Sequence, residues 1–408
     1  MSMEVHIEWE RTTHLVGRLY SAGRGQAVSF EYSAEWLARQ SAFAIDPTSI
    51  PMQRGVMHSS VLFGAIQDCG PDRWGKILIE RAVRKGVLEQ RPFQEIDYVL
   101  ALDDHSRIGA LRFKSGHDEA FLTQGTGELP PIVQLPALLR ATEAIHSETE
   151  TTKDLRFLLG QGSPLGGARP KSAVVLPDGS LGIAKFAKPD DVRDIAAGEI
   201  LALSLARASG IRTADHQLVP VGGHAVAVIK RFDREQGHRI PFISASSLLG
   251  LPIGEAGSYT MLADAIRQFG DNISGDLREL WRRMVFSLLA SNYDDHLRNH
   301  GFLMHHSGCW SLSPAYDVNP VPEIERAGIN KISISEDGND PSIELAIKAS
   351  PRFGLKADEA VGILREMMIV LQTWRKHGQK LHLSASQLNA YASAFENDFV
   401  KEAQEHVG

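Results

Sequence analysis

Residues 291–303 read Ser-Asn-Tyr-Asp-Asp-His-Leu-Arg-Asn-His-Gly-Phe-Leu, and the interpretation of the whole chain starts from this stretch. Within it, Asp294 is followed by Asn299, which gives the spacing D-x-x-x-x-N. In kinase catalytic loops with this spacing, the aspartate accepts a hydrogen bond from the attacking hydroxyl and the asparagine helps to hold Mg²⁺. Because the bare spacing also arises often by chance, its meaning depends on further motifs in the right order.

A second isolated carboxylate follows the loop. Residues 313–320 read Ser-Pro-Ala-Tyr-Asp-Val-Asn-Pro, a proline-bounded turn that contains Asp317. Carboxylate oxygens are ligands that Mg²⁺ prefers, and kinases hold the metal that bridges the nucleotide phosphates with such an aspartate. Asp317 is therefore a candidate metal ligand beside Asn299.

A glycine-rich stretch lies upstream, at residues 160–171, and ends with Arg169 and Lys171. Glycines let backbone N–H groups surround an anion, although a glycine cluster alone is equally compatible with a flexible loop. A hairpin signal, Pro-Asp-Gly-Ser, follows at residues 177–180, so a dinucleotide fingerprint, which needs a helix there, is disfavoured. A glycine loop, a hairpin and then a strand lysine form the order found in kinase-type nucleotide sites.

The strand lysine is Lys185, which lies within an apolar run. A lone strand lysine is usually an exposed residue, but its apolar neighbours make Lys185 a candidate for binding phosphate. Such a lysine needs a carboxylate to fix it, and Glu199 on the following helix is the candidate. From spacing alone, a solvated helix position is slightly favoured for Glu199.

One near miss is excluded as a nucleotide site. Residues 70–76 mimic the phosphate-loop pattern G-x-x-x-x-G-K, but Ile77 replaces the Ser or Thr that Mg²⁺ requires. His305, His306 and Cys309 are expected in a hairpin turn rather than as metal ligands.

Composition and charge narrow the class of protein. The chain has 408 residues, 43% of them hydrophobic, and a formal net charge of -7. This length suggests two or three domains. An acidic chain is not expected to bind nucleic acid by itself, so DNA is a partner only through a local patch or a companion protein. Two cysteines, no signal-peptide pattern and no apolar run near the ~20 residues that span a bilayer predict a cytoplasmic protein.

The pattern along the chain predicts three regions. We expect an N-terminal α+β domain with its linker over residues 1–148, a kinase N-lobe-like region over 149–235, and a helical lobe with the catalytic loop over 236–408. The glycine- and proline-rich residues 125–136 are the expected linker. Strands are predicted at residues 5–9, 14–20, 27–32, 172–176, 181–186 and within 219–231, and helices at 74–85, 137–146, 196–209, 261–269, 277–293, 356–376 and 385–396.

Taken together, these motifs resemble the HipA family of bacterial toxin kinases. The resemblance is carried by residues 70–75, 165–171, 229–234, 292–302 and 312–320 and runs from about residue 5 to residue 380. It implies a two-lobed, phosphatidylinositol-kinase-like serine/threonine-protein kinase of the α+β class, with an extra N-terminal α+β domain and an all-α C-terminal lobe. It also implies ATP and Mg²⁺ as cofactors.

The resemblance assigns a role to each matching residue. It implies that Asp294 is the catalytic base, that Asn299 and Asp317 are the Mg²⁺ ligands, and that Lys185 binds phosphate. The remaining expected ATP-binding residues are Gly166, Gly167, Ala168, Arg169, Pro170 and Lys171 in the nucleotide loop, Lys230, Arg231 and Phe232 in a hinge that holds adenine mainly through its backbone, and His296, Tyr316, Val318 and Asn319 around them.

The resemblance also implies partners. Family members act as the toxin of a toxin–antitoxin pair, with a small helix-turn-helix antitoxin of HipB type, and the complex represses its own operon. DNA would thus be contacted only indirectly, and no membrane is expected. Known targets include aminoacyl-tRNA synthetases, whose phosphorylation arrests growth and is linked to persistence.

One departure concerns autophosphorylation. Many members phosphorylate a glycine-loop serine, which ejects the loop, but Pro164 occupies that place here and Ser163 precedes it. Self-inactivation either uses Ser163 or is absent.

Two alternatives stay open: a small-molecule kinase on the same scaffold, and a catalytically silent co-repressor module. Retention of Lys185, Asp294, Asn299 and Asp317 argues against the second.

Overall fold

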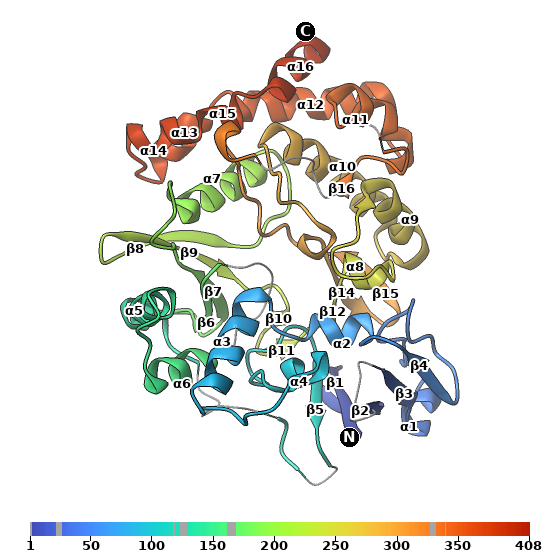
Figure 1. Cartoon of the computed structure of the whole chain (residues 1–408). Coiled ribbons are helices and arrows are strands. Elements are labelled where there is room, and N and C mark those ends of the chain that lie inside the picture. Colours follow the sequence, from blue (N-terminus) through green and yellow to red (C-terminus); the bar gives the residue numbers. More distant parts are fainter. Residues whose placement is uncertain are drawn as a thin grey trace.

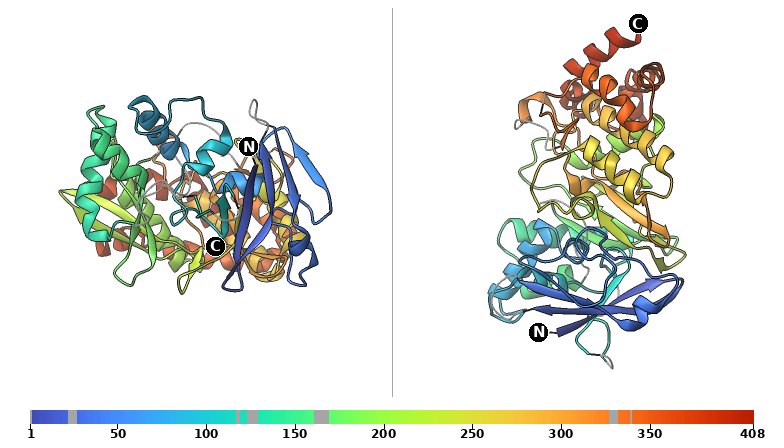
Figure 2. Two further views of the ribbon diagram at one scale, coloured as in Figure 1. Left: turned by 90° about the horizontal axis from the view of Figure 1, so that it is seen from below. Right: turned by 90° about the vertical axis from the view of Figure 1, so that its right-hand side faces the viewer.

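The computed structural model describes residues 2–21, 27–116, 119–122, 129–160, 169–326, 332–338 and 340–408. The N-terminal sheet lies at one end of the molecule, the helical part at the other, and a second sheet between them (Figures 1 and 2). The structure is a mixed α+β fold, and the division into regions at residues 148 and 235 stays a prediction.

The N-terminal sheet is antiparallel with the order β4-β3-β2-β1-β5. Its strands are β1 (Ser2–Trp9), β2 (Thr12–Ser21), β3 (Val28–Tyr32), β4 (Val56–Ser59) and β5 (Leu111–Lys114). In β3, buried residues alternate with half-buried ones, as expected for a strand that packs one face on a core. Trp36 from α1 (Ala34–Ala38) is fully buried and its ring nitrogen donates to the Phe43 carbonyl. The predicted strands at 5–9, 14–20 and 27–32 are confirmed.

The central sheet has the order β6-β7-β9-β8 and carries the glycine-loop end of the candidate site. Its strands are β6 (Lys171–Val175), β7 (Leu181–Lys185), β8 (His216–Val221) and β9 (His224–Lys230). Gly222 and Gly223 both adopt positive φ between β8 and β9, a backbone that a tight hairpin turn requires and glycine accepts without strain.

Helices cover both faces of the central sheet. Because side chains alternate along a strand, Val226 and Val228 of β9 face one core while Ala227 and Ile229 face another. The first core is formed with α3 (Arg73–Arg84), α5 (Leu135–His146) and α6 (Thr152–Gly160), and the second with α7 (Ile195–Ala208). An N-terminal helix, α3, therefore shares a core with the kinase-like sheet.

The C-terminal part is dominated by helices. They are α8 (Ala245–Leu248), α9 (Tyr259–Phe269), α10 (Ile273–Leu289), α11 (Ile343–Ala349), α12 (Ala357–Leu371), α13 (Trp374–Lys380), α14 (Ala385–Ala390), α15 (Ala392–Phe395) and α16 (Asp398–Val407), with short 3-10 turns η2 (Leu297–Asn299), η3 (Glu323–Glu325) and η4 (Ser350–Phe353). Two more short helices, α2 (Gly64–Asp68) and α4 (Glu95–Leu100), and the turn η1 (Ile132–Gln134) belong to the earlier regions. None of the helices in the described part of the chain is both long and apolar enough to span a membrane.

One detail of the prediction needs correction: the C-terminal lobe is not all-α. It contains an antiparallel sheet of β12 (Phe242–Ser244), β14 (Gly301–His306) and β15 (Cys309–Leu312), and β13 (Gly257–Ser258) pairs with β16 (Ile332–Ser333). β12, β13, β15 and β16 have four residues or fewer and are too short to give a clear pattern in the sequence, whereas the six residues of β14 are as long as strands that were predicted. The hairpin expected around His305, His306 and Cys309 is confirmed, since β14 and β15 flank that turn.

A buried charge cluster ties the N-terminal domain to the chain that follows β9. Asp233 accepts hydrogen bonds from the Arg231 and Arg234 guanidiniums and from the Gly109 backbone N–H at 2.7 Å. Burial by itself would raise the pKa of Asp233, but these arginines hold it well below its usual value. The cluster lies beside the small hairpin of β10 (Arg234–Glu235) and β11 (His238–Arg239).

The Asp233→Asn variant is expected to lower the free energy of unfolding by roughly 1.5–3 kcal/mol, because charge-assisted hydrogen bonds are lost in a buried site. A carboxylate with a lowered folded pKa stabilises the protein above its unfolded pKa of about 3.9, and this contribution disappears as the pH falls toward the folded value. Thermal unfolding at pH 7 and near pH 2 measures both effects. The control is Asp215→Asn, which removes an exposed pair with Arg207 and should change stability far less; equal losses would contradict the prediction.

Candidate active site

The predicted catalytic loop lies between the end of α10 and the start of β14. Asp294 is exposed, whereas the adjacent Asp295 is buried. The Tyr259 hydroxyl donates to Asp295, and His300 Nε2 lies 2.9 Å from the other carboxylate oxygen. Burial would raise the pKa of Asp295, but the His300 ring holds it below its usual value. Asp295 thus fixes the loop from inside, a role that the sequence analysis did not identify.

The side-chain amide of Asn299 is hydrogen-bonded through its nitrogen but not through its oxygen among the described residues. Its Nδ2 donates to the Asp294 carbonyl at 3.1 Å, which closes the loop on itself. Its Oδ1 is buried and has no hydrogen-bond partner among the described residues. An unpaired buried oxygen is costly unless a ligand approaches it, so the donor set fits a hard cation such as Mg²⁺.

Lys185, Glu199 and Asp317 come together from β7, α7 and the turn after β15. Lys185 Nζ lies 2.6 Å from Glu199 Oε1 and 2.8 Å from Asp317 Oδ1. The sequence offers this pairing of the strand lysine with a helix glutamate only as a candidate, and the structure contains it. Lys185 therefore has a fixed position close to the second candidate metal ligand.

The charges of this cluster are coupled. Burial would lower the pKa of Lys185, but Asp317 and Glu199 raise it above its usual value. Burial would raise the pKa of Asp317, but Lys185 and Lys171 hold it well below its usual value, whereas burial keeps the pKa of Glu199 raised. Asp317 is thus the acid that retains its negative charge most firmly, as a metal ligand must.

The turn that carries Asp317 is connected to the catalytic loop. Asp317 has a φ of 57°, and Asn319 Nδ2 donates to its Oδ1 at 3.0 Å. The Asn319 backbone N–H donates to Asn292 Oδ1 at 3.0 Å. The two candidate Mg²⁺ ligands therefore lie on segments that are joined directly.

Lys171 belongs to β6 rather than to a free loop. It lies opposite Lys185 in the β6–β7 register, and its buried Nζ is 2.5 Å from Asp72 Oδ2. Asp72 also caps α3 by accepting from the Gly75 N–H at 2.7 Å, and Trp74 Nε1 donates to the Lys171 carbonyl at 3.2 Å. Residues 70–76 are thus a helix start and a domain contact, in agreement with their exclusion as a phosphate loop.

The nucleotide loop is only partly described. Gly166, Gly167, Ala168 and Ser163 lie outside the described residues. Arg169 forms an ion pair with Asp191 at 2.7 Å. The Pro170 carbonyl accepts from the Phe186 N–H at 2.9 Å, which extends the β6–β7 pairing toward the loop.

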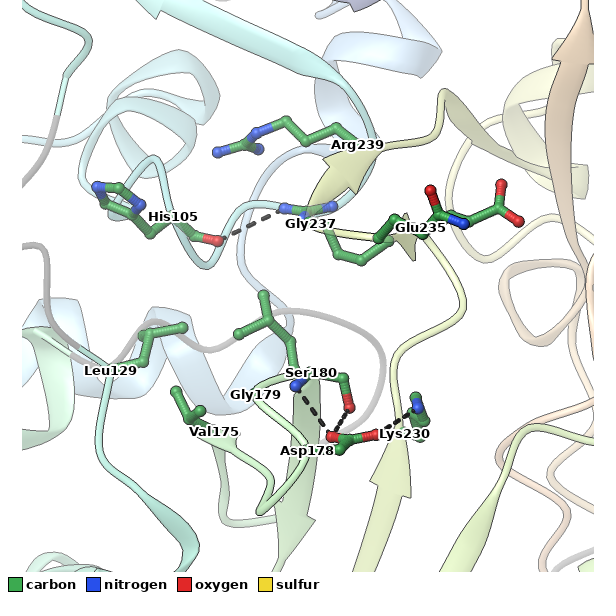
Figure 3. Close-up of a pocket in the computed structure, with 13 residues that line it drawn as sticks. His105, Leu129, Val175, Asp178, Gly179, Ser180, Lys230, Glu235, Gly237 and Arg239 are labelled. Atoms are coloured by element: carbon green, nitrogen blue, oxygen red, sulfur yellow. Dashed lines mark hydrogen bonds and ion pairs between the residues drawn. The ribbon is translucent and has the colours of Figure 1, made fainter. Parts of the chain in front are cut away.

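The predicted hinge directs two side chains away from the Lys185 cluster. Arg231 is buried in the Asp233 cluster, and Lys230 pairs with Asp178 at 2.8 Å. Figure 3 shows this pair at the edge of a cavity of about 710 Å³ between the β6–β7 turn and the β10–β11 hairpin. Among the expected site residues that the structure describes, only Lys230 lines this cavity. An adenine contact at Lys230 and Arg231 would have to use the backbone, as the sequence analysis expects.

The remaining predicted residues surround the catalytic loop. The Phe232 and Tyr316 rings lie 5.3 Å apart between centroids, and the Tyr316 hydroxyl donates to the Arg298 carbonyl at 2.8 Å. Val318 is buried, and the buried Nδ1 of His296 has no partner in the described part of the chain. No group of three or more His, Cys, Asp or Glu side chains that would bind a metal occurs among the described residues. The expected Mg²⁺ site has only two protein ligands, so it does not require such a group.

Two family models match this chain. Residues 9–114 match the family model of the HipA N-terminal domain, and residues 163–374 match that of the HipA-like C-terminal domain. Over its whole length the structure is similar to a solved structure of the Shewanella oneidensis MR-1 toxin–antitoxin system, described as a complex of HipA, HipB and its operator DNA. The TM-score is 0.66 at 16% sequence identity, covering 99% of this chain and 97% of that one. This likeness shows a shared kinase-like fold.

Two curated relatives match a shorter part of the chain. A protein named "Putative kinase" from Haemophilus influenzae is 25% identical over 206 residues, which are 44% of this chain and 60% of the relative. A protein named "Putative kinase Y4dM" from Sinorhizobium fredii is 28% identical over 203 residues, which are 44% of this chain and 49% of the relative. The matched part thus spans only half to three fifths of these relatives. The two family models together extend over most of the described fold and include every cluster described above, and the chain belongs to the HipA family.

Proposed function

We propose that this protein is an ATP- and Mg²⁺-dependent serine/threonine-protein kinase that acts as the toxin of a HipA–HipB-like pair. The observation that supports it most is the junction of Lys185, Glu199 and Asp317 beside a loop whose Asn299 oxygen has no partner among the described residues. Phosphoryl transfer depends almost entirely on positioning and charge neutralisation, and this is the residue set that those tasks require.

Each residue has a task in this proposal. Asp294 accepts the hydrogen bond of the substrate hydroxyl and directs it toward the transferred phosphoryl group. Lys185 binds the nucleotide phosphates, and Glu199 keeps its ammonium group in place. Asn299 and Asp317 hold Mg²⁺, which when bound neutralises charge on the phosphates.

The direct test is transfer of γ-labelled phosphate from ATP to proteins of a cell extract by the purified chain. Label is expected on serine or threonine of a discrete protein, such as an aminoacyl-tRNA synthetase, and it should disappear when Mg²⁺ is chelated. Turnover of a sugar or lipid without any protein labelling would favour the small-molecule kinase. Absence of all transfer, with nucleotide binding retained, would favour the silent co-repressor.

The proposed partner is a small helix-turn-helix protein of HipB type. In this proposal the chain contacts operator DNA only indirectly, through that partner. The solved relative was determined as a complex of that kind. Co-expression with a helix-turn-helix protein encoded beside this gene should yield a co-purifying complex and restore growth. A complex that forms but leaves growth arrested would contradict the antitoxin role.

Self-phosphorylation at Ser163 is tested separately, by mass spectrometry of the loop peptide after incubation with Mg·ATP. A phosphate there would add about -1.5 to -2 charges next to the triphosphate site and would repel the nucleotide. An unmodified peptide from an enzyme that does phosphorylate a substrate would mean that regulation uses another route, most simply the antitoxin.

A further inference from the structure

A second cavity, of about 280 Å³, opens beside the catalytic loop where the N-terminal domain approaches it. Arg298 contributes to its wall from the catalytic loop, and Arg73 and Lys76 contribute from α3. Ile253, a half-exposed apolar side chain, lies on a further part of the rim. The cavity is not lined by Lys185, Asn299 or Asp317, so it is separate from the candidate phosphate and metal site.

The acidic groups of this cavity already have basic partners. Glu95 accepts two hydrogen bonds from Lys76 Nζ, at 2.9 and 2.8 Å. Asp72 pairs with buried Lys171 at 2.5 Å. Neither carboxylate is therefore available to neutralise a further cation in the wall.

The two arginines, in contrast, have no such partners among the described residues. Neither the Arg73 nor the Arg298 guanidinium makes a hydrogen bond or ion pair with any residue that the structure describes. The positive charge of Arg298 lowers the pKa of nearby Asp68, although burial leaves that pKa raised. The hydrogen bonds of the Asp68 carboxylate come instead from the Ser244 backbone N–H at 2.7 Å and the Ser244 hydroxyl at 2.8 Å. The cavity thus presents unpaired donors for an anion.

We propose that Arg73 and Arg298 form a subsite for an acidic side chain of the protein substrate, close to its phosphorylated residue. This inference rests on the proposed kinase function. A guanidinium matches a carboxylate with two parallel hydrogen bonds, and Arg298 lies in the same loop as Asp294, which would meet the acceptor hydroxyl. Arg73 comes from the N-terminal domain, so this domain would contribute to substrate choice.

Fluorescein-labelled peptides test the subsite by anisotropy, in the presence of Mg²⁺ and a non-hydrolysable ATP analogue. Each peptide has one serine and carries either Glu or Gln at one flanking position. At one or more positions, the Glu peptide should bind about ten-fold more tightly than its Gln counterpart, since a charge-assisted hydrogen bond is worth about one such factor.

Variants of Arg73 and Arg298 test whether these two side chains cause the preference for the Glu peptide. Arg73→Gln and Arg298→Gln should each reduce the preference for Glu several-fold, whereas Arg298→Lys should retain part of it. Arg84→Gln is the matched control, because Arg84 is an exposed arginine of the same helix outside the cavity. Thermal unfolding verifies that each variant is folded. If Arg298→Gln is unstable, Arg73→Gln still tests the subsite, because Arg73 is exposed and its replacement should not affect folding.

The outcomes are distinct. No preferred Glu position, or a preference that survives in both glutamine variants, would overturn the subsite. A loss of ATP-analogue affinity in Arg298→Gln without any effect on peptide preference would overturn it too, by assigning the arginine to nucleotide phosphate. Arginine-dependent preference for Glu in a protein that transfers no phosphate would support the subsite and contradict the kinase function instead.

Discussion

The Asp294→Asn variant is expected to lose phosphoryl transfer by roughly 10²–10⁴-fold while it binds ATP as well as the unchanged protein does. A positioned general base contributes a factor of this size, and an amide cannot accept the proton of the substrate hydroxyl. Asp294 is exposed, and in this proposal Lys185, Asn299 and Asp317 hold the phosphates and the metal, so ATP affinity should be retained.

Initial rates of label transfer at saturating ATP, together with calorimetric ATP affinity, measure both parts of this prediction. Asp358→Asn is the matched control, because Asp358 is an exposed aspartate of α12 in the helical lobe. Near-normal incorporation by the Asp294 variant would remove this residue from the reaction. A parallel loss of ATP affinity would instead indicate a role in nucleotide binding.

The Asp317→Ala variant is expected to lose at least roughly 100-fold in Mg·ATP affinity. Even groups that only support a metal ligand are typically worth 10–100-fold in metal affinity, so a direct ligand should cost no less. Binding of adenosine, which has neither phosphate nor metal, should change little. The substitution also leaves Lys185 with Glu199 as its remaining carboxylate partner in the cluster.

Calorimetric titrations with Mg·ATP and with adenosine separate the two contributions. Asp317→Asn keeps one oxygen ligand without the charge and should fall between the unchanged protein and the alanine variant. If alanine weakens both ligands equally, Asp317 is a structural residue that holds Lys185, and the metal assignment fails.

Much of the candidate site was predictable because its residues carry local signals. Lys185 stood out as a charge within an apolar strand, and Asp317 as an acid within a proline-bounded turn. Glu199 was only a candidate partner for Lys185, because spacing alone slightly favoured a solvated helix position, and the structure has the two side chains 2.6 Å apart. Strand periodicity located β1, β2, β3, β6 and β7 in the same way.

The contacts between distant segments were not predictable. Asp72 and Lys171 are 99 residues apart, and Asp233 meets Gly109 across 124 residues. A charged residue looks the same in the sequence whether it is buried in a pair or solvated, so only tertiary packing identifies these partners. For the same reason the sequence did not show that Asp295 is buried in the catalytic loop. Nor did it show that the guanidinium of the hinge residue Arg231 is buried. The predicted helix over 356–376 likewise divides at residues 372–373, where no glycine or proline marks the break.

The shared core of α3 and the central sheet has a consequence for how the protein is made. The apolar face of α3, with Trp74, Leu78 and Ile79, is completed by β6 and β9, which the ribosome adds later. Domains usually fold in order of synthesis, but this helix must remain uncovered on the nascent chain until the kinase-like sheet emerges. Asp317 is added later still. A growing polypeptide therefore exposes the apolar face of α3 early and gains the complete Lys185–Glu199–Asp317 cluster late, so premature contacts of α3 are expected to compete with folding until the later strands are synthesised.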